Sequence, residues 1–318
     1  MKRRVPPTPP ALDLSRVQTY PLRTRRSKVA KQLIATPPRR GMSLGQFFRN
    51  LPDILAAHDF RAAAATIAAR HRAGKRIVLG MGAHPIKVGL SPLIIDLMER
   101  GILSAVAMNG ACIVHDFELA YAGETSEDVA TNLIEGQFGM AEETGRFLNQ
   151  TIASAGADHG LGEAVGRQIL AAGFRNTRLS ILAAGARLGI PVTVHVAIGT
   201  DIIHMHPSAD GGAIGAASLR DFRRLAAVVG GLRGGVFINL GSAVVIPEVF
   251  VKALNLARNV GKRVDRLVTL DMDFIRHYRP GVNVIQRPTA PDGQGYRLTG
   301  HHEIMFPLLC AAVLEQVG

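Results

Sequence analysis

The sequence has no tryptophan, and aromatic residues make up only 5% of its 318 residues. With 34 glycines and 47% hydrophobic residues, this composition favours a closely packed α/β protein over a β-sandwich. The two cysteines, Cys112 and Cys310, lie far apart and predict neither a disulfide framework nor a cysteine-based metal site. No apolar run reaches the ~18 residues of a transmembrane helix. We therefore expect a cytoplasmic protein without a membrane span.

Most of the positive charge belongs to the first 42 residues. The formal net charge is +12, and residues 1–42 carry eleven lysines and arginines against one acid, Asp13. This leader is rich in proline and lacks the apolar stretch of a signal peptide. Such a composition cannot form a buried core. We therefore predict an arm that is either solvated or lies along the surface of a partner. Clustered cations can also contact phosphate, but no nucleic-acid-binding motif accompanies them, which disfavours nucleic acid as a partner.

Short apolar runs alternate with helical patterns over residues 75–318. One helix is predicted over residues 60–72 with Asp59 as its N-cap, and Ser126 is expected to cap a later helix. The alternation predicts an α/β fold: a doubly wound, mostly parallel, Rossmann-like sheet with helices on both faces. There is no internal repeat or clear linker, so residues 43–318 are expected to form one domain. The strands are expected over residues 77–79, 104–108, 191–198, 234–240 and 266–270.

Four of the predicted strands end in small residues. Glycine at a strand end lets the backbone approach a ligand closely, and a following helix offers free N–H groups to a phosphate. Together they favour a pocket of dinucleotide size; the alternative is that the glycines only permit tight turns, and there is no strict G-x-G-x-x-G. The residues predicted to line the cofactor are Gly82, Asn109, Gly110, Gly199, Thr200, Gly241 and Ser242.

Ionisable residues are dense around the same strand ends. His115 is the preferred general base, because imidazole titrates near neutral pH and Asp116 or Glu118 can fix its tautomer. His195 lies inside a predicted strand and is expected to pack in the core. The full set predicted to contact substrate or transfer protons is His84, Lys87, His115, Asp116, Asp201, His204 and Glu248.

A metal site is an alternative interpretation of the segment that follows the third strand. His204 and His206 are two residues apart, and on an extended segment they would point the same way. With Asp201 or Asp210 they could bind Zn²⁺ or another divalent ion, which would indicate a metal-dependent hydrolase or lyase. The pattern is common, and no H-E-x-x-H motif or cysteine pair supports it.

Several local phrases resemble the deoxyhypusine synthase-like family over roughly residues 75–316. They are Gly241-Ser242-Ala243-Val244-Val245, Met305-Phe306-Pro307-Leu308-Leu309, and Ser180-Ile181-Leu182 followed by Ile190-Pro191-Val192. The resemblance implies an NAD-binding, Rossmann-type parallel sheet, oxidoreductase or transferase chemistry, and a homotetramer.

The chain also departs from that family at positions that carry its chemistry. The family's substrate-linked lysine falls where this chain has Asn283-Val284-Ile285-Gln286, and without the amine no covalent imine can form there. The family's aspartate before F-P-L-L is His301 here, which the resemblance places beside the cofactor, and a histidine pair is replaced by Pro247-Glu248. We therefore expect an NAD-dependent enzyme that acts on a small amine- or hydroxyl-bearing substrate and does not synthesise deoxyhypusine. A non-enzymatic scaffold that binds a partner through its basic arm is the remaining hypothesis.

Overall fold

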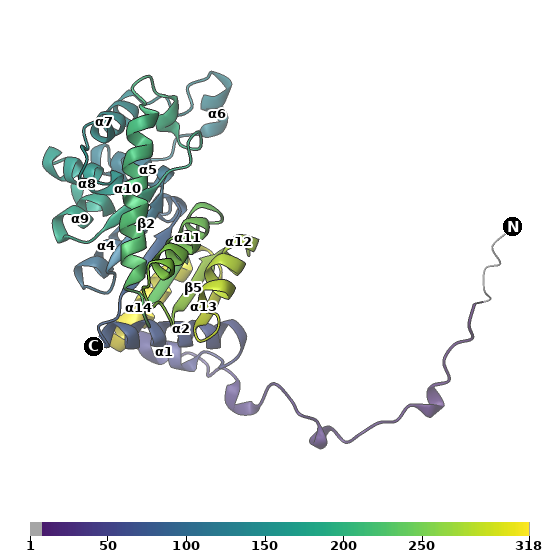
Figure 1. Ribbon diagram of the computed structural model, residues 1–318. Coiled ribbons are helices and arrows are strands. Elements are labelled where there is room, and N and C mark those ends of the chain that lie inside the picture. Colours follow the sequence, from purple (N-terminus) through teal and green to yellow (C-terminus); the bar gives the residue numbers. More distant parts are fainter. Residues whose placement is uncertain (1–7, 318) are drawn as a thin grey trace.

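The computed structural model describes residues 8–317 and contains a single six-stranded sheet between two layers of helices (Figure 1). All strand pairs are parallel, and the order across the sheet is β3-β2-β1-β4-β5-β6. The predicted α/β class and parallel sheet are confirmed. The strands are β1 (Ile77–Met81), β2 (Ala105–Asn109), β3 (Val192–His195), β4 (Val236–Leu240), β5 (Val268–Asp273) and β6 (Gln294–Thr299).

Alternate residues of the strands face opposite helix layers, because successive side chains on a strand point to opposite sides. Leu79 of β1 belongs to the larger core cluster, and its neighbour Val78 belongs to the second cluster on the other face. The larger cluster includes residues of α2 (Leu55–Arg72), α4 (Ser91–Glu99), α5 (Gly110–Tyr121), α7 (Glu142–Ala153), α8 (Leu161–Ala172), α9 (Ile181–Leu188) and α14 (His302–Val317). The second cluster includes residues of α10 (Gly211–Gly230), α11 (Val245–Asn259) and the π-helix η6 (Gly281–Gln286).

The remaining helices are short and lie at the ends of the layers or in loops. They are α1 (Leu44–Asn50), α3 (His84–Lys87), α6 (Val129–Ile134), α12 (Tyr278–Pro280), α13 (Arg287–Thr289), and the 3-10 helices η1 (Leu14–Arg16), η2 (Leu22–Thr24), η3 (Lys31–Leu33), η4 (Thr177–Leu179) and η5 (Ile202–Met205).

The strand order reverses between β1 and β4. β1, β2 and β3 follow one another from the centre of the sheet to one edge. The 20-residue helix α10 then connects β3 to β4, which pairs with β1 on its other side, and β5 and β6 continue to the opposite edge. In open parallel sheets, ligands bind outside the carboxyl ends of the strands at such a switch point. The order fixes which strand ends are neighbours, and with it the position of the residues described below.

Two local predictions were wrong. Helix α2 begins at Leu55, before Asp59, with Ile54 as its N-cap. Asp128 caps α6 through the N–H of Thr131, while Ser126 has a left-handed backbone with φ of 74°. The ionisable residues at positions 115–118 lie on α5, because Gly110 opens this helix immediately after Asn109 at the end of β2.

The basic arm is described from residue 8 onward, and it runs away from the body as an extended chain (Figure 1). Residues 1–7 of the predicted arm lie outside the described residues. Backbone hydrogen bonds from Asp53 to Leu33 and from Thr36 to Asn50 tie the end of the arm to the loop around α1. The described part before Lys31 is mostly exposed.

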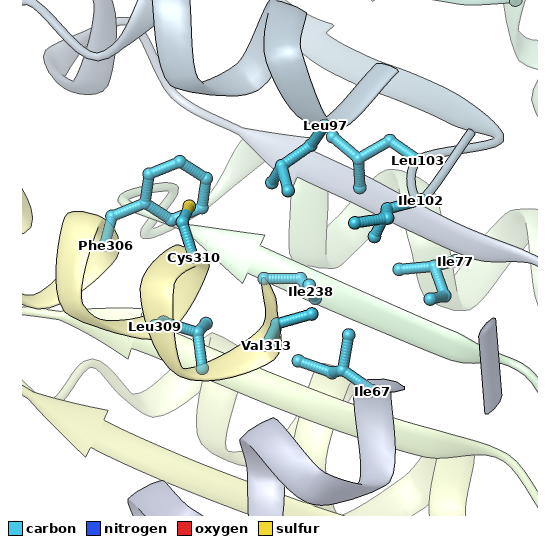
Figure 2. Close-up of a pocket in the computed structure, with 10 residues that line it drawn as sticks. All are labelled: Ile67, Ile77, Leu97, Ile102, Leu103, Ile238, Phe306, Leu309, Cys310 and Val313. Carbon is cyan, nitrogen blue, oxygen red and sulfur yellow. The ribbon is translucent and has the colours of Figure 1, made fainter. Parts of the chain in front are cut away.

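A small apolar cavity of about 20 Å³ lies inside the core (Figure 2). Ile67 of α2, Leu97 of α4, Phe306 and Cys310 of α14, and Ile238 of β4 are among its lining residues. Its volume is about that of one water molecule, and its lining is apolar, so it is a packing defect and no ligand site. No helix within residues 8–317 has the length and apolar character needed to cross a membrane.

Candidate functional site

A cleft of about 600 Å³ opens at the carboxyl ends of β2 and β3. Its size lies in the usual range for small-molecule sites. Lys87 of α3 borders it on one side, and Ala111, His115 and Glu118 of α5 form another wall. The loop before α6, the start of α7 and the loop before η5 complete the lining, the last of these through Thr200 and Asp201. Several of the side chains predicted to act on a substrate therefore line this cleft.

His115 is held in this wall by a chain of two hydrogen bonds. Its Nδ1 lies 2.7 Å from Oγ1 of Thr125, and the Thr125 hydroxyl donates to a carboxylate oxygen of Glu118. Thr144 donates to the other oxygen of Glu118 at 3.1 Å. A hydroxyl has only one hydrogen, so Thr125 must accept from His115. The proton of neutral His115 is therefore on Nδ1, and Nε2 keeps its lone pair.

Burial and the nearby ammonium of Lys87 lower the pKa of His115 to about 4. The imidazole is therefore neutral at physiological pH and can accept a proton through Nε2. Because the pKa in the folded chain is below its ordinary value, stability gained from the neutral form is lost as the pH falls from about 6.5 through about 4.

We expect an NMR titration of the His115 ring to give a midpoint near pH 4, well below the ordinary value of about 6.5. Histidines labelled with ¹⁵N in the full chain provide the measurement, and His115→Asn assigns the signal. A midpoint for His115 near the ordinary value of about 6.5 would contradict the described burial.

Asp116 does not orient His115, although the two are adjacent in sequence. Successive helix residues point about 100° apart, and Asp116 is directed from α5 towards the start of α9. There its carboxylate accepts hydrogen bonds from the N–H of Ile181 at 2.7 Å, from Leu182 and from the Ser180 hydroxyl. Burial raises its pKa to about 6 despite these bonds. Of the two acids considered for orienting the base, Glu118 is the one in place.

Asp201, which lines the cleft, forms a pair of largely buried side chains with His204. Nδ1 of His204 accepts from the N–H groups of Gly199 and Asp201, so its proton is on Nε2. That nitrogen lies 3.9 Å from Oδ2 of Asp201, and neither atom has a hydrogen-bond partner within residues 8–317. The same oxygen lies against Gly110 at the start of α5, where a β-carbon would clash with it. Burial raises the pKa of Asp201.

The proposed metal cluster of His204, His206 and Asp201 is not formed. The segment is the 3-10 helix η5 and its end, so the two histidines do not share an extended face. His206 turns away and contacts Glu142 at 3.1 Å and Ser208 at 2.7 Å. Among the residues that the structure describes, no group of three histidine, cysteine or acidic side chains is arranged to hold a metal ion.

A second cluster lies beside the switch point, at the ends of β1, β4 and β5. The ring of His84 packs against His302 and Phe274, with centroids 5.3 and 5.6 Å away. His301 stacks on Phe274, with ring centroids 6.0 Å apart. Asp273, at the end of β5, lies 3.7 Å from Nε2 of His302. Burial lowers the pKa of His302, which is 1% exposed.

The turns after β1 and β4 touch each other at their glycines. The Gly82 N–H donates to the Leu240 carbonyl, and a β-carbon on Gly82 would lie 2.3 Å from the Gly241 carbonyl oxygen. Gly241 has a left-handed φ of 65°, and the ring of His302 fills the space where its side chain would be. Ser242 follows and accepts the N–H of Ile246 in the first turn of α11. Both turns need glycine for close backbone contact.

Helix α3 lies between the cleft and the switch-point cluster. His84 and Lys87 are three residues apart on this four-residue helix; His84 packs in the cluster, and Lys87 borders the cleft. Gly82, Gly241, Ser242, His84 and His301 are thus grouped at the switch point. Lys87, Asn109, Gly110, His115, Gly199, Thr200, Asp201 and His204 are grouped in or beside the cleft.

Glu248 lies outside both groups. It binds Lys252 of its own helix, accepts from Asn283 at 2.8 Å, and lies 3.4 Å from Arg279. Its hydrogen bond with Lys252 is the main cause that lowers its pKa, and these partners give it a structural role. His195 is buried and bonded to Thr193, as expected for a packing residue. The residues that sequence reasoning missed are Thr125, Thr144 and Phe274, because none of them has a motif or an ionisable group.

No protein-family model matches the chain, and no curated protein matches it in sequence. Solved structures share its fold at low identity. The "putative deoxyhypusine synthase" from Entamoeba histolytica has a TM-score of 0.53 at 12% identity, with 87% of this chain and 94% of that chain covered. The "conserved putative LOR/SDH protein" from Methanococcus maripaludis S2 has a TM-score of 0.53 at 15% identity, with 92% and 75% covered.

AgrE, in its ternary complex with ornithine and NAD⁺, has a TM-score of 0.51 at 14% identity, with 80% of this chain covered. The chain spans 33% of the length of AgrE and 31% of the arginine dihydrolase ArgZ. This chain therefore has the deoxyhypusine synthase-like fold that its sequence phrases indicated.

Proposed function

We propose that the protein is an NAD-dependent enzyme that acts on a small amine- or hydroxyl-bearing substrate bound in the cleft. The observation that carries this proposal is the free Nε2 of His115, a neutral imidazole held in the wall of a cleft of about 600 Å³. The strand order, with its switch point between β1 and β4, supports a dinucleotide. The shared fold with AgrE, which is seen with NAD⁺ and ornithine, supports it as well.

The switch-point residues have the chemistry that a dinucleotide requires. Gly82 and Gly241 let the two turns and His302 pack closely together, and Ser242 and Ala243 keep the approach to α11 small. Asn109 does not cap α5 with its side chain, so the first turn of this 12-residue helix offers N–H groups beside the cleft. Such groups favour phosphate. When bound, NAD⁺ supplies a hydride acceptor.

In this proposal the side chains of the cleft divide the remaining work. His115 accepts a proton from the amine or hydroxyl of the substrate at Nε2, while Glu118 and Thr125 hold the Nδ1 proton. Asp201, which lines the cleft, binds a donor group of the substrate. Lys87 binds an anionic group of the ligand. The anion neutralises the positive charge of Lys87, which is one of the two causes that lower the pKa of His115. Ligand binding therefore raises the pKa of His115 and makes the imidazole a stronger base.

We propose that the reaction differs from deoxyhypusine synthesis. The positions that resemble the family's lysine segment form η6, where Asn283 binds Glu248 and Arg287 and no amine is present. Lys87, the lysine of the cleft, lies on the opposite side of the switch point.

Addition of NAD⁺ is expected to raise the thermal stability of the full chain. A ligand at 100 times its Kd stabilises the folded state by ~2.7 kcal/mol, which a thermal-unfolding scan detects. NADP⁺, ATP and divalent metal ions are the comparison ligands, and amines and amino acids are then screened for NADH formation. Stabilisation by a metal ion alone, with no response to NAD⁺ or NADH, would contradict the proposal.

A further inference from the structure

The segment between α5 and α7, residues 123–140, forms one wall of the cleft. It differs from the other walls of the cleft because its helix contributes no buried residue. We name it the lid. It contains α6, and none of the α6 residues is buried. Val129, Leu133 and Ile134 are 44%, 63% and 86% exposed. A six-residue helix without buried contacts has little stability of its own, so the attachments at the ends of the lid decide where it lies.

Both ends of the lid carry residues with left-handed backbone angles. Gly123 and Ser126 lie at the first end, with φ of 83° and 74°, and Gly136 and Gly139 lie at the second, with φ of 71° and 75°. Glycine adopts several backbone conformations at low cost, and hinges are formed by a few loop residues that absorb such changes. The two ends are therefore the places where the backbone of the lid can bend.

Thr125 is the point where the lid is fastened to α5. Within residues 8–317, the side-chain hydrogen bonds between the lid and the rest of the chain are those of Thr125 with His115 and Glu118. The other side-chain bonds of the lid are internal, such as those from Gly139 and Asn132 to Glu127. The hydroxyl that holds the lid is thus the same hydroxyl that accepts the Nδ1 proton of His115.

We propose that Thr125 is a positioning residue that couples closure of the lid to the tautomer of His115. With the lid down, the Thr125 hydroxyl donates to Glu118 and accepts from Nδ1, so the lone pair of His115 is on Nε2. With the lid raised, Nδ1 loses its acceptor, and the proton is free to move to Nε2. His115 can then act as a base through Nε2 only when the lid is closed over the cleft. This inference rests on the proposed role of His115.

The test compares Thr125→Val, which keeps the shape and removes the hydroxyl, with Thr125→Ser, which keeps the hydroxyl. Thr131→Val is the matched control, because Thr131 lies exposed on the same lid and uses only its backbone N–H. The first readout is the ¹⁵N shifts of His115 in the full chain without ligand, which report the tautomer. The second is hydrogen exchange of the amides of residues 123–140.

We expect Thr125→Val to reduce the Nδ1–H form of His115 and to speed exchange across the lid, whereas Thr125→Ser and Thr131→Val match the natural chain. Once a substrate is known, kcat of Thr125→Val should fall roughly 10- to 100-fold, as for other residues that orient a functional group through a hydrogen bond, with recovery in Thr125→Ser. An unchanged tautomer and unchanged exchange in Thr125→Val would overturn the coupling. If the tautomer shifts but His115→Ala leaves turnover intact, the coupling stands and the proposed function fails.

Discussion

Turnover in the His115→Ala variant is expected to be lower by roughly 10²- to 10⁴-fold, the usual contribution of a general base. The alanine removes the Nε2 lone pair that faces the cleft and leaves the Glu118 and Thr144 contact in place. Because the proton is removed in the transition state, kcat should fall more than KM rises. Initial rates of NADH formation with a substrate from the screen provide the measurement.

His58→Ala is the control for this change. His58 is an exposed histidine on α2 that binds Asp53, and it lies outside the cleft residues. Its rates should equal those of the natural chain. Equal rates in His115→Ala would show that another group removes the proton. Lost NAD⁺ binding in His115→Ala would instead indicate that the imidazole contacts the cofactor.

The Asp221→Leu variant is expected to lose about 2–6 kcal/mol of unfolding free energy. One carboxylate oxygen of buried Asp221 accepts the N–H groups of Gly162 and Val194, each at 2.8 Å, and so joins α8 to β3. Leucine leaves both donors buried without an acceptor, at about 1–3 kcal/mol each. Urea denaturation of the two proteins at one pH measures the difference.

Asp221→Asn separates the hydrogen bonds from the charge. The amide oxygen can accept both N–H groups, so this variant should retain most of the stability. Burial raises the pKa of Asp221 to about 7, above its ordinary value, so the folded state holds the proton more tightly than the unfolded state. The stability gained from that proton is lost as the pH rises from about 4 through about 7.

The asparagine variant lacks this pH dependence, so its advantage over the natural chain should grow between pH 4 and pH 7. Comparing the two proteins cancels the opposing effects of His115 and His195, whose pKa values are both lowered to about 4 by burial. Parallel stability curves for the two proteins would show that Asp221 does not titrate in this range.

The architecture could be predicted from the sequence because hydrophobic period and glycine position are local properties. Apolar runs that end in glycine mark parallel strands, and the class and the layers on both faces followed from them. The strand order did not, since it depends on the long crossover through α10 and on which strand β4 pairs with. That order placed His84 with His302, residues that are more than two hundred positions apart in the sequence.

The side-chain partners were less predictable, for reasons of geometry. His115 and Asp116 are adjacent, but helical rotation sends one to the cleft and the other to α9. His204 and His206 were interpreted on an extended backbone, and η5 turns them apart. Thr125 carried no signal at all, because a single hydroxyl in a polar loop has no distinguishing pattern. Its position became meaningful only through its distance to His115.

The residues that line the cleft all come from residues 87–202, the part of the chain that holds β2 and β3. The second half, from β4 onward, contributes most of the switch-point cluster and no lining residue of the cleft. The residues that line the cleft thus lie in one continuous stretch of the sequence. We expect that exchanging residues 87–202 between related proteins, while the paired strands β1 and β4 are kept, would transfer the substrate preference as a unit.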